Sequence, residues 1–283
     1  MSVPVGASLR RRKSLGQHFL RNKSLASRIV DALGALDEAN VLEIGAGSGA
    51  LTNELAARAA HLTAIEIDSE LAASLQRKFD ACSSVEVKTE DVLQFDILSW
   101  ASAGRPLRPV VVGNIPYRIT NSLLHRLMEF HSQLELVVLM LQEEVARKLT
   151  TPAGKKPYGM LSVLASYYAE VEYMFFVSRD NFHPRPRVDS ALVKIDFARP
   201  YKRRALDEGL FQRLVRRLFA DRRKQVQKIL RKDPRFALSA EDLAALARDT
   251  ELDLSCRPEN LSVGQLVELA DALAALKGTF RMK

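Results

Sequence analysis

The sequence has little cysteine and no long apolar run. Cys82 and Cys256 are the only cysteines among 283 residues, and they stand too far apart to indicate a metal site or a disulfide framework. No stretch approaches the ~20 apolar residues that a membrane helix needs, and the N-terminal region lacks the apolar centre of a signal peptide. The five histidines have no metal-binding spacing, and no serine or cysteine nucleophile motif occurs. We therefore expect a cytoplasmic protein that binds neither a membrane nor a metal.

Acidic residues are scarce in two segments of the chain. Residues 1–28 contain seven Lys and Arg and no acid, and residues 199–235 contain 14 basic and 4 acidic residues. The rest is mildly acidic, with net charges of −6 over residues 29–198 and −3 over residues 236–283. Two basic segments on an acidic core are typical of a protein that binds a polyanion, whereas a surface that serves solubility alone mixes the two signs. We therefore predict nucleic acid as the partner.

The pattern of apolar residues changes near residue 199. Before it, short β-branched runs alternate with helical segments, which is typical of a parallel α/β sheet. After it, leucines recur at helical spacing with basic residues between them. The predicted parts are a basic N-terminal arm over residues 1–28, a catalytic α/β domain over 29–198 and a helical RNA-binding domain over 199–283. The predicted strands before residue 142 are 41–44, 62–67, 85–88, 110–112 and 134–141, with helices at 50–60 and, capped by Ser24, up to about Leu33.

Groups that can bind a ligand follow four of these strands. A glycine-rich turn, Gly45 to Gly49, follows the first strand, and Glu66, Asp91 and Asn114 stand at the ends of the other three. Because open parallel sheets bind their ligands at the carboxyl ends of the strands, we expect these groups to meet in one pocket. The glycine turn alone also fits the loose dinucleotide fingerprint, so by itself it is a weak signal.

The acidic residues of this pocket indicate a nucleoside that carries a cationic group. Glu66 stands 23 residues after Glu43, at the position that grips ribose hydroxyls. Asp91 can accept from an adenine amino group, and Glu43 can hold a cation but would repel a pyrophosphate. An isolated acid at a strand end is more often a helix cap or a solvated loop residue. The joint register of these acids with the glycine turn favours the nucleoside pocket.

The segment Asn114-Ile115-Pro116-Tyr117 has the composition of a site for a purine amino group. Pro116 fixes its own φ at about −65° and keeps Ile115 out of the helical region, so that the preceding carbonyls point outward. The side-chain oxygen of Asn114 and the carbonyl of Ile115 can then accept from one amino group, while Tyr117 offers a face for stacking. The alternative is a simple strand-ending turn with Tyr117 as a half-buried plug.

Aromatic and basic residues elsewhere extend this interpretation to RNA. Phe182 stands in a proline-rich loop and could supply a second stacking surface, although a packed hairpin connection explains the same loop equally well. The helices after residue 199 have a cationic polar face that suits a folded RNA backbone. The predicted phosphate contacts are Arg10, Arg11, Arg12, Lys13, Arg185, Arg187, Arg222, Arg223 and Lys224.

The ordered set of these motifs resembles the ribosomal RNA adenine N6,N6-dimethyltransferases of the KsgA type. The resemblance implies an α/β fold, with a Rossmann-like class I S-adenosylmethionine-dependent methyltransferase sheet and a small all-helical C-terminal domain. Each motif is a modest signal, but together they match in order over nearly the whole chain, at residues 14–20, 43–49, 66, 91, 113–120, 141–146, 158–163, 182–190, 219–224 and 257–263.

The same resemblance implies a reaction and its partners. The cofactor would be S-adenosyl-L-methionine and its product S-adenosyl-L-homocysteine. Two adjacent adenines in the 3′-terminal hairpin of small-subunit (16S) rRNA would each receive two methyl groups, with a role in small-subunit biogenesis. The partners would thus be the small ribosomal subunit and its rRNA, without a metal or a membrane, and we expect the protein to be a monomer.

Carried over by position, the site residues of the family fall on the motifs already named. Asn114 and Ile115 would act on the target amino group, while Tyr117 and Phe182 would sandwich the target base. The implied cofactor contacts are Gln17, His18, Leu20, Gly45, Gly47, Glu66, Ile67, Asp91, Val92 and Asn114.

Four positions depart from the usual pattern of the family. The family usually has Asn at His18, Pro at Ala46, Asn at Arg118 and Lys at Glu143. His18 keeps a hydrogen-bonding group and Ala46 keeps the turn small. Arg118 and Glu143 change the charge near the site, which leaves the local RNA contacts open.

Other functions share parts of the pattern. A large-subunit rRNA adenine methyltransferase of the macrolide-resistance type would share every catalytic residue, and a DNA adenine methyltransferase would share the Asn-Pro-Tyr chemistry. A non-catalytic rRNA-binding assembly factor or a transcription factor on the same scaffold would not need Glu66, Asp91 and Asn114 intact. An NAD-binding oxidoreductase fits the glycine turn alone.

Overall fold

The computed structural model describes residues 17–281 and divides into two compact units. The first unit contains the described chain up to Glu143 together with residues 174–194. The second contains residues 144–173 and the chain from Ile195 onward. The functional division predicted at residues 28 and 198 stays a prediction.

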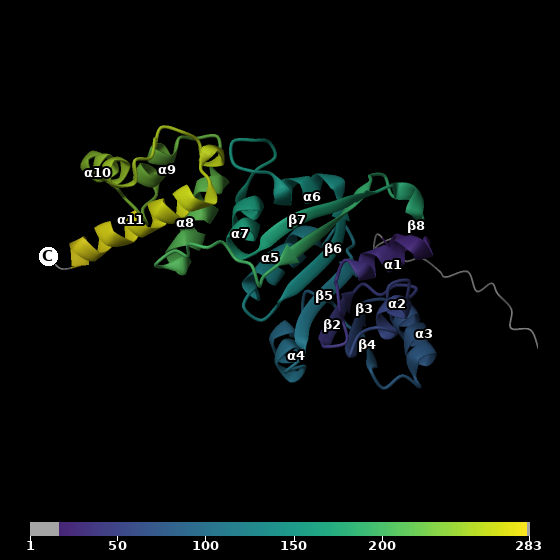
Figure 1. Ribbon diagram of the computed structural model, residues 1–283. Helices are drawn as coiled ribbons and strands as arrows, with labels where there is room; N and C mark the ends of the chain where they lie inside the picture. Colours follow the sequence, from purple (N-terminus) through teal and green to yellow (C-terminus); the bar gives the residue numbers. More distant parts are fainter. Residues whose placement is uncertain (1–16, 282–283) are drawn as a thin grey trace, which may run out of the picture. The chain divides into compact units, whose positions relative to one another are not determined.

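A seven-stranded sheet has the strand order β4-β3-β2-β5-β6-β9-β7 (Figure 1). From β2 the chain proceeds to β3 and β4 on one side and then returns to β5 and β6 on the other, all in parallel pairing. The order therefore reverses between β2 and β5, the place where open sheets bind ligands. The strands are β2 (Ala39–Ile44), β3 (His61–Glu66), β4 (Val85–Thr89), β5 (Arg108–Asn114), β6 (Leu136–Gln142), β7 (Glu170–Val177) and β9 (Ser190–Asp196).

One face of this sheet buries an apolar cluster against two helices of the first unit. Val41 of β2 and Val112 of β5 belong to the same buried cluster as Ile29 of α1 and Leu55 of α2. Each such aliphatic side chain contributes about 1.5–3 kcal/mol when it is fully buried, so this cluster fixes the strands whose ends carry the predicted pocket. The helices of this unit are α1 (Lys23–Asp31), α2 (Thr52–Ala56), α3 (Ser69–Phe79), α4 (Ile97–Ala103) and α5 (Thr120–Glu129).

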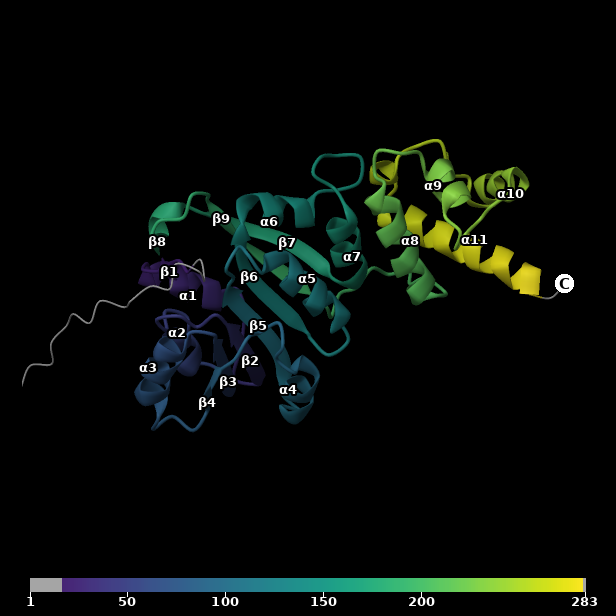
Figure 2. The ribbon, with the colours of Figure 1, turned by 180° about the vertical axis from the view of Figure 1, so that it is seen from behind.

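A short ribbon joins the start of the described chain to the loop after β7. Strand β1 (Phe19–Leu20) pairs antiparallel with β8 (Phe182–His183), which follows the 3₁₀ turn η2 (Arg179–Asn181). The backbone N–H of Arg21 also donates to the Asn181 carbonyl at 3.0 Å. In Figure 2, β1 lies beside β8 and next to α1.

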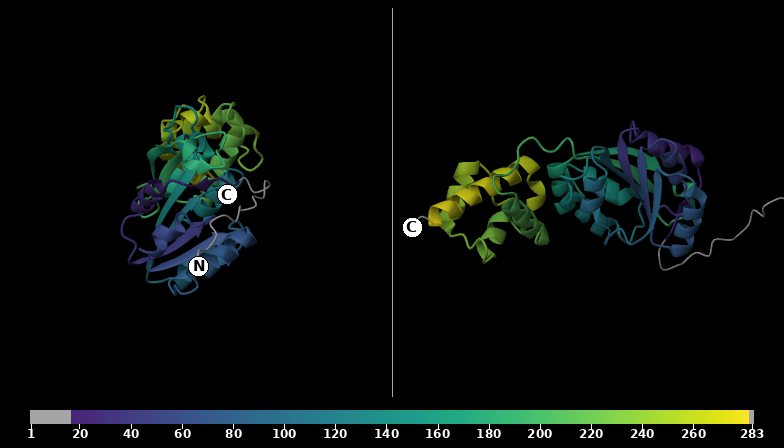
Figure 3. Two further views of the ribbon diagram at one scale, coloured as in Figure 1. Left: turned by 90° about the vertical axis from the view of Figure 1, so that its right-hand side faces the viewer. Right: turned by 90° about the horizontal axis from the view of Figure 1, so that it is seen from below.

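The second unit is mainly helical, and α8 and α10 pack against α11 (Figure 3). Tyr167 of α7 stacks on Phe211 of α8 with 4.2 Å between the ring centroids, and the Tyr158 hydroxyl donates to the Leu261 carbonyl at 3.0 Å. No helix among residues 17–281 is both long enough and apolar enough to cross a membrane. The helices are α6 (Glu143–Thr150), α7 (Met160–Tyr168), α8 (Glu208–Ala220), α9 (Val226–Lys232), α10 (Ala240–Thr250), η3 (Pro258–Asn260) and α11 (Val263–Arg281).

Two local expectations from the sequence are wrong. The helix predicted over residues 50–60 is shorter, because α2 covers only Thr52–Ala56 and a turn follows it. The first helix is capped by Asn22 rather than Ser24, since the Asn22 side chain accepts from the backbone N–H of Leu25 at 3.1 Å. Both residue types are good N-caps, so the sequence did not distinguish them.

The close pairing of β2 and β5 leaves no room for a side chain at Gly113. A Cβ there would lie 2.6 Å from the carbonyl oxygen of Ile44 in the neighbouring strand. We expect Gly113→Ala to lower the free energy of unfolding by about 1–3 kcal/mol, the usual cost of overpacking, as measured by urea denaturation. Gly159→Ala is the matched control, because its Cβ would stand 3.6 Å from its nearest neighbour. Equal losses in the two variants would contradict the steric explanation.

Candidate functional site

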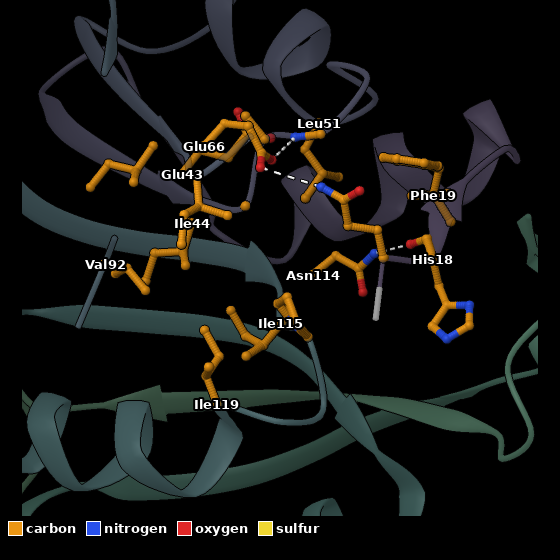
Figure 4. Close-up of a pocket in the computed structure, with 18 of the residues that line it drawn as sticks. His18, Phe19, Glu43, Ile44, Leu51, Glu66, Val92, Asn114, Ile115 and Ile119 are labelled. Atoms are coloured by element: carbon orange, nitrogen blue, oxygen red, sulfur yellow. Dashed lines mark hydrogen bonds between the residues drawn. The ribbon is translucent and has the colours of Figure 1, made fainter. Parts of the chain in front are cut away.

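One pocket in the first unit gathers residues from the carboxyl ends of β2, β3 and β5 and from the turns that follow them (Figure 4). Every residue predicted to contact the cofactor or the target base lines it, so sequence positions 17 to 182 meet in one place. Their individual roles remain predictions. These lining residues are Gln17, His18, Leu20, Gly45, Gly47, Glu66, Ile67, Asp91, Val92, Asn114, Ile115, Tyr117 and Phe182.

The glycine turn forms a tight cradle at one side of this pocket. Gly47 has φ +57°, a conformation that suits glycine, and a Cβ there would stand 3.1 Å from the Phe19 ring. Its backbone N–H donates to Glu66 Oε2 at 2.8 Å. The turn after β2 is therefore held directly by the carboxylate at the end of β3.

Glu66 is buried and well bonded by the protein. Its Oε1 accepts from the backbone N–H of Asp68 at 2.8 Å and lies 3.5 Å from Gln17 Nε2. Burial raises the pKa of this carboxyl group, although the backbone donors of Asp68 and Gly47 oppose the shift. A carboxylate offers about four acceptor positions, so these three donors leave capacity for one hydroxyl of a ligand.

Glu43 is the buried acid behind the pocket. Its side chain is 1% exposed and lines the cavity, and no described residue donates to its Oε2. Burial raises the pKa of Glu43 to about 7, although the side chain and the backbone of Thr52 oppose the shift. A buried carboxyl group with an unpaired oxygen is complementary to a cationic group of a ligand, because a positive partner would relieve the cost of ionising it.

Asn114 is oriented by the main chain of the N-terminal segment. Its Nδ2 donates to the carbonyl oxygen of His18 at 2.9 Å, as the dashed line in Figure 4 marks. Because a carbonyl can only accept, this bond decides which end of the amide faces His18. The acceptor Oδ1 is therefore directed elsewhere. The next residue is fixed as well, since the backbone N–H of Ile115 donates to the Met140 carbonyl at 3.3 Å.

Tyr117 is held at its hydroxyl end. The hydroxyl lies 3.0 Å from Ser190 Oγ, and partial burial raises the pKa of the phenol. Ser190 is itself positioned by a clamp one residue earlier, where Asp189 accepts from Arg179 Nε at 2.9 Å and from Arg179 Nη2 at 2.7 Å. These bonds with Arg179 lower the pKa of Asp189 to about 2. The tyrosine ring therefore sits on a rigid support.

Phe182 is more deeply buried than Tyr117 and His18, which are both half-buried. Phe182 is 5% exposed and belongs to the apolar cluster of the first unit, paired with Leu20 across the ribbon, so little of its ring is open to a ligand. The His18 ring lies 5.9 Å from the Tyr117 ring, and its Nδ1 is 2.6 Å from the Pro184 carbonyl. The structure thus puts the ring of His18, a residue that the sequence did not assign to stacking, close to Tyr117.

Asp91 and Ile67 are two further residues predicted to contact the cofactor. Asp91 accepts from the backbone N–H of Leu93 at 2.9 Å, which orients its carboxylate. Ile67 is 47% exposed and could lose this apolar surface on binding a flat ring. Ala46, one of the family departures, is buried against Ala64 and Leu75 and also lines the pocket. No group of three or more His, Cys, Asp or Glu within the described chain could hold a metal ion.

Basic residues predicted to contact RNA are only partly free in the first unit. Arg10 to Lys13 lie outside the described residues. Arg185 pairs with Asp180 at 2.9 Å, although both side chains are largely exposed. Arg187 is exposed, and its carbonyl accepts from Arg179 Nη1 at 2.7 Å. Arg118, which stands where the family usually has Asn, is exposed and lines the pocket.

In the second unit, two of the three predicted RNA contacts are already paired. Arg222 Nη2 lies 2.9 Å from Glu259, and Lys224 Nζ lies 3.0 Å from Asp221. Arg223 between them is exposed. Helix α9 also carries three exposed cations that the sequence analysis did not predict as RNA contacts: Lys228, Arg231 and Lys232. A sequence alone does not show which basic residues pair with an acid in the folded protein.

Several residues that shape the site were missed by sequence reasoning. Phe19 contacts the glycine turn, and Ser190 and the Arg179–Asp189 clamp support Tyr117. Phe19 lies in the motif at residues 14–20, and Asp189 and Ser190 lie in the motif at 182–190, but no local pattern assigned a role to these three residues.

Comparison with known proteins places the chain among methyltransferases of ribosomal RNA. The family model for ribosomal RNA adenine dimethylase matches residues 8–274. The ribosomal RNA small subunit methyltransferase A of Pseudomonas aeruginosa is 39% identical over 270 residues, which cover 95% of this chain and 97% of that protein. A protein of the same name from Alcanivorax borkumensis is 35% identical, with 93% of this chain and 90% of that protein covered.

Solved structures agree with the fold. The crystal structure of the 23S rRNA methyltransferase ErmE is similar with a TM-score of 0.69 and 28% identity, over 90% of this chain and 99% of that one. A dimethyladenosine transferase from Plasmodium falciparum has a TM-score of 0.72 at 22% identity, over 89% and 96% of the two chains, and supports the fold alone. The predicted Rossmann-like methyltransferase fold with a helical C-terminal region is confirmed. Since the family model and these relatives span nearly the whole sequence, the chain belongs to the ribosomal RNA adenine dimethylase family.

Proposed function

We propose that the protein dimethylates the N6 amino groups of two adjacent adenines in the 3′-terminal hairpin of small-subunit rRNA, with S-adenosyl-L-methionine as methyl donor. The observation that carries this proposal is the orientation of Asn114, whose Nδ2 donates a hydrogen bond to the His18 carbonyl. Its Oδ1 is left to accept from an amino group, as adenine N6 requires. The substrate assignment is supported by relatives named ribosomal RNA small subunit methyltransferase A.

The residues of the pocket fit this cofactor. The remaining acceptor capacity of Glu66 suits a ribose hydroxyl, and the oriented carboxylate of Asp91 suits the adenine amino group. The unpaired Oε2 of Glu43 suits the cationic methionine end. The exposed side chain of Ile67 and the buried Val92 provide apolar surface for the adenine ring. When bound, the cofactor supplies a methyl group on a positively charged sulfur.

Asn114 and Ile115 perform the step at the target base. Adenine N6 is planar and poorly nucleophilic because its lone pair is delocalised into the ring. Acceptors for both of its hydrogens favour the positive charge that develops on this nitrogen in the transition state. Asn114 Oδ1 and the Ile115 carbonyl provide them, and the bonds to the His18 and Met140 main chain hold both groups in place. The methylated nitrogen is acidic and loses its proton to water.

Tyr117 holds the target base after it leaves its stack in the RNA. Unstacking costs a few kcal/mol, and stacking on an aromatic ring returns about 1–3 kcal/mol per base. The hydroxyl bond to Ser190 fixes the position of the far end of the Tyr117 ring. Phe182 would form the opposite face of this sandwich, with the part of its ring that lines the pocket.

The RNA backbone would bind the exposed cations of the second unit. Arg223, Lys228, Arg231 and Lys232 are exposed and free of the acid contacts that hold Arg222 and Lys224. The helical part over residues 199–283 would thus be the RNA-binding domain, residues 29–198 the catalytic domain and residues 1–28 a basic arm on the RNA. A monomer in the cytoplasm, without metal or membrane, suffices for this function.

A large-subunit rRNA methyltransferase is the second candidate, because the ErmE structure is 28% identical. The small-subunit assignment is favoured by the higher identity of 39% to a named small-subunit enzyme. Incubation with labelled S-adenosyl-L-methionine and unmethylated small or large subunits, followed by mapping of the modified bases, separates the two. The same assay detects a non-catalytic assembly factor by the absence of label, and an arm with duplex DNA tests the DNA methyltransferase.

The role of Asn114 predicts a selective loss of catalysis. Asn114→Ala removes the oriented acceptor, so the rate of methyl transfer to small subunits should fall at least about 100-fold. The affinity for S-adenosyl-L-homocysteine, measured by calorimetry, should change little because Glu43, Glu66 and Asp91 remain. Undiminished dimethylation by this variant would refute the role.

The raised pKa of Glu43 predicts that cofactor binding depends on pH. With a pKa of about 7, the free carboxyl group is protonated below neutral pH and cannot pair with a cation. The affinity should therefore rise up to about fivefold from pH 6 to 7 and about twofold more to pH 8, then level off, with a proton released on binding at the lower pH. Calorimetry in buffers of different ionisation enthalpy measures the proton. Glu43→Gln is the matched control, since it leaves only the titration of the ligand; an unchanged pH profile in this variant speaks against the pairing.

The exposed cations predict the salt dependence of RNA binding. The double variant Arg223→Ala and Lys228→Ala removes two phosphate contacts, so the slope of log K against log salt concentration for a small-subunit rRNA hairpin should fall by about 2. Arg203→Ala is the control, because its guanidinium is already held by Glu268 at 3.1 Å and Asp271 at 3.2 Å. If the control lowers the slope as much as the double variant, these cations have no special part in RNA binding.

A further inference from the structure

The pocket described above is acidic on one side and has a single basic residue on the other. Glu43, Glu66, Glu90 and Asp91 line it from β2, β3 and the turn after β4. Arg118, in the turn between β5 and α5, is the one Lys or Arg among the described residues that line it. The acidic side suits the cationic cofactor proposed above, whereas Arg118 would repel its positively charged sulfur. The place of Arg118 at this pocket is thus explained by a different, anionic partner.

The guanidinium of Arg118 is available to such a partner. Arg118 is exposed, and no group within the described chain forms a hydrogen bond or an ion pair with its side chain. Arg179, in contrast, lies 2.7 Å from Asp189. Arg185 lies 2.9 Å from Asp180. A guanidinium has five donors in a planar fork that matches the geometry of a phosphate, and it is charged at neutral pH. Arg118 therefore offers an anion-binding group at the wall of the pocket.

Arg118 directly follows Tyr117, the residue on which the target base is proposed to stack. Consecutive Cα atoms are about 3.8 Å apart, so the two side chains start from the same short stretch of backbone. A base that leaves its stack brings its ribose and the two adjoining phosphodiester groups with it. The proposed reaction thus brings an anion to the neighbourhood of Arg118.

A second exposed arginine belongs to the loop that supports the other end of the Tyr117 ring. The Tyr117 hydroxyl lies 3.0 Å from Ser190 Oγ, and Arg187 stands three residues before Ser190. The Arg187 carbonyl accepts from Arg179 Nη1 at 2.7 Å, which holds its backbone while its side chain stays exposed. The backbone end and the hydroxyl end of Tyr117 are therefore each accompanied by one exposed arginine.

We propose that Arg118 binds the phosphodiester group on one side of the target adenine and that Arg187 binds the group on the other side. The inference rests on the proposed function and deepens it, because it gives the RNA strand a path across the catalytic pocket. Phosphate contacts do not read the sequence, but they fix the register of the strand. With its backbone held at these two arginines, the strand presents the N6 of one adenine to Asn114.

A neutral phosphate analogue tests the two contacts directly. The probe is a small-subunit rRNA hairpin in which one of the two target adenines is replaced by guanine, so that a single adenine defines the register. A methylphosphonate replaces the phosphodiester on the 5′ or the 3′ side of this adenine. Affinity is measured with protein saturated with S-adenosyl-L-homocysteine. The original protein should bind each modified hairpin about tenfold more weakly, as expected for one lost charge-assisted contact.

The arginine variants should respond to one modification each. Arg118→Gln should bind the unmodified hairpin about tenfold more weakly and lose nothing further at one of the two positions, because the contact there is already absent. Arg187→Gln should behave in the same way at the other position. Arg118→Lys keeps the charge and should recover most of the affinity. Arg77→Gln is the matched control, since Arg77 in α3 is also exposed but does not line the pocket; it should bind all hairpins like the original protein.

Three results would overturn the inference. The first is an Arg118→Gln variant that responds to both modifications as the original protein does. The second is a coupling of both arginines to the same phosphodiester group. The third is a loss of affinity for S-adenosyl-L-homocysteine in Arg118→Gln with unchanged urea unfolding, which would assign the guanidinium to the carboxylate of the cofactor. An original protein that neither binds nor methylates small-subunit RNA contradicts the proposed function, and this inference with it.

Discussion

The hydrogen bond from Asn114 to the His18 carbonyl is the constraint on which the site depends. A primary amide can present either end to a ligand, and only a fixed partner decides which one. Here the partner is a main-chain carbonyl 96 positions earlier, so the orientation does not depend on the side chain at position 18. This explains how a histidine can stand where the family usually has asparagine while the amide keeps its direction.

The support of the site follows one principle, in which groups predicted to bind a ligand are held by hydrogen bonds to other groups of the protein. Glu66 is held by backbone N–H groups, and Tyr117 by Ser190. Such support reduces the motion that binding would otherwise have to freeze, and so contributes to affinity and rate without touching the substrate. The exception is Glu43, whose Oε2 has no hydrogen-bond partner among the described residues.

The sequence predicted the sheet and the composition of the pocket better than the contacts behind them. Valine runs and the glycine turn follow from local physics, so the strands up to β6 were placed within two residues. The ends of parallel strands must converge, which is why Glu66, Asp91 and Asn114 were expected together. In contrast, the ion pairs of Arg222 and Lys224 join residues with no common pattern, and the burial of Phe182 depends on its pairing with β1. Such long-range choices are not encoded in any local window.

The ribbon of β1 and β8 has a consequence for how the protein is made. One wall of the pocket is built from residues 18–20 and from Phe182, which are brought together only after more than 160 intervening residues have been placed. Closing a loop of this length gains nothing until its far end exists. During synthesis this wall can therefore form only after β8 has been translated, when nearly two thirds of the chain exists.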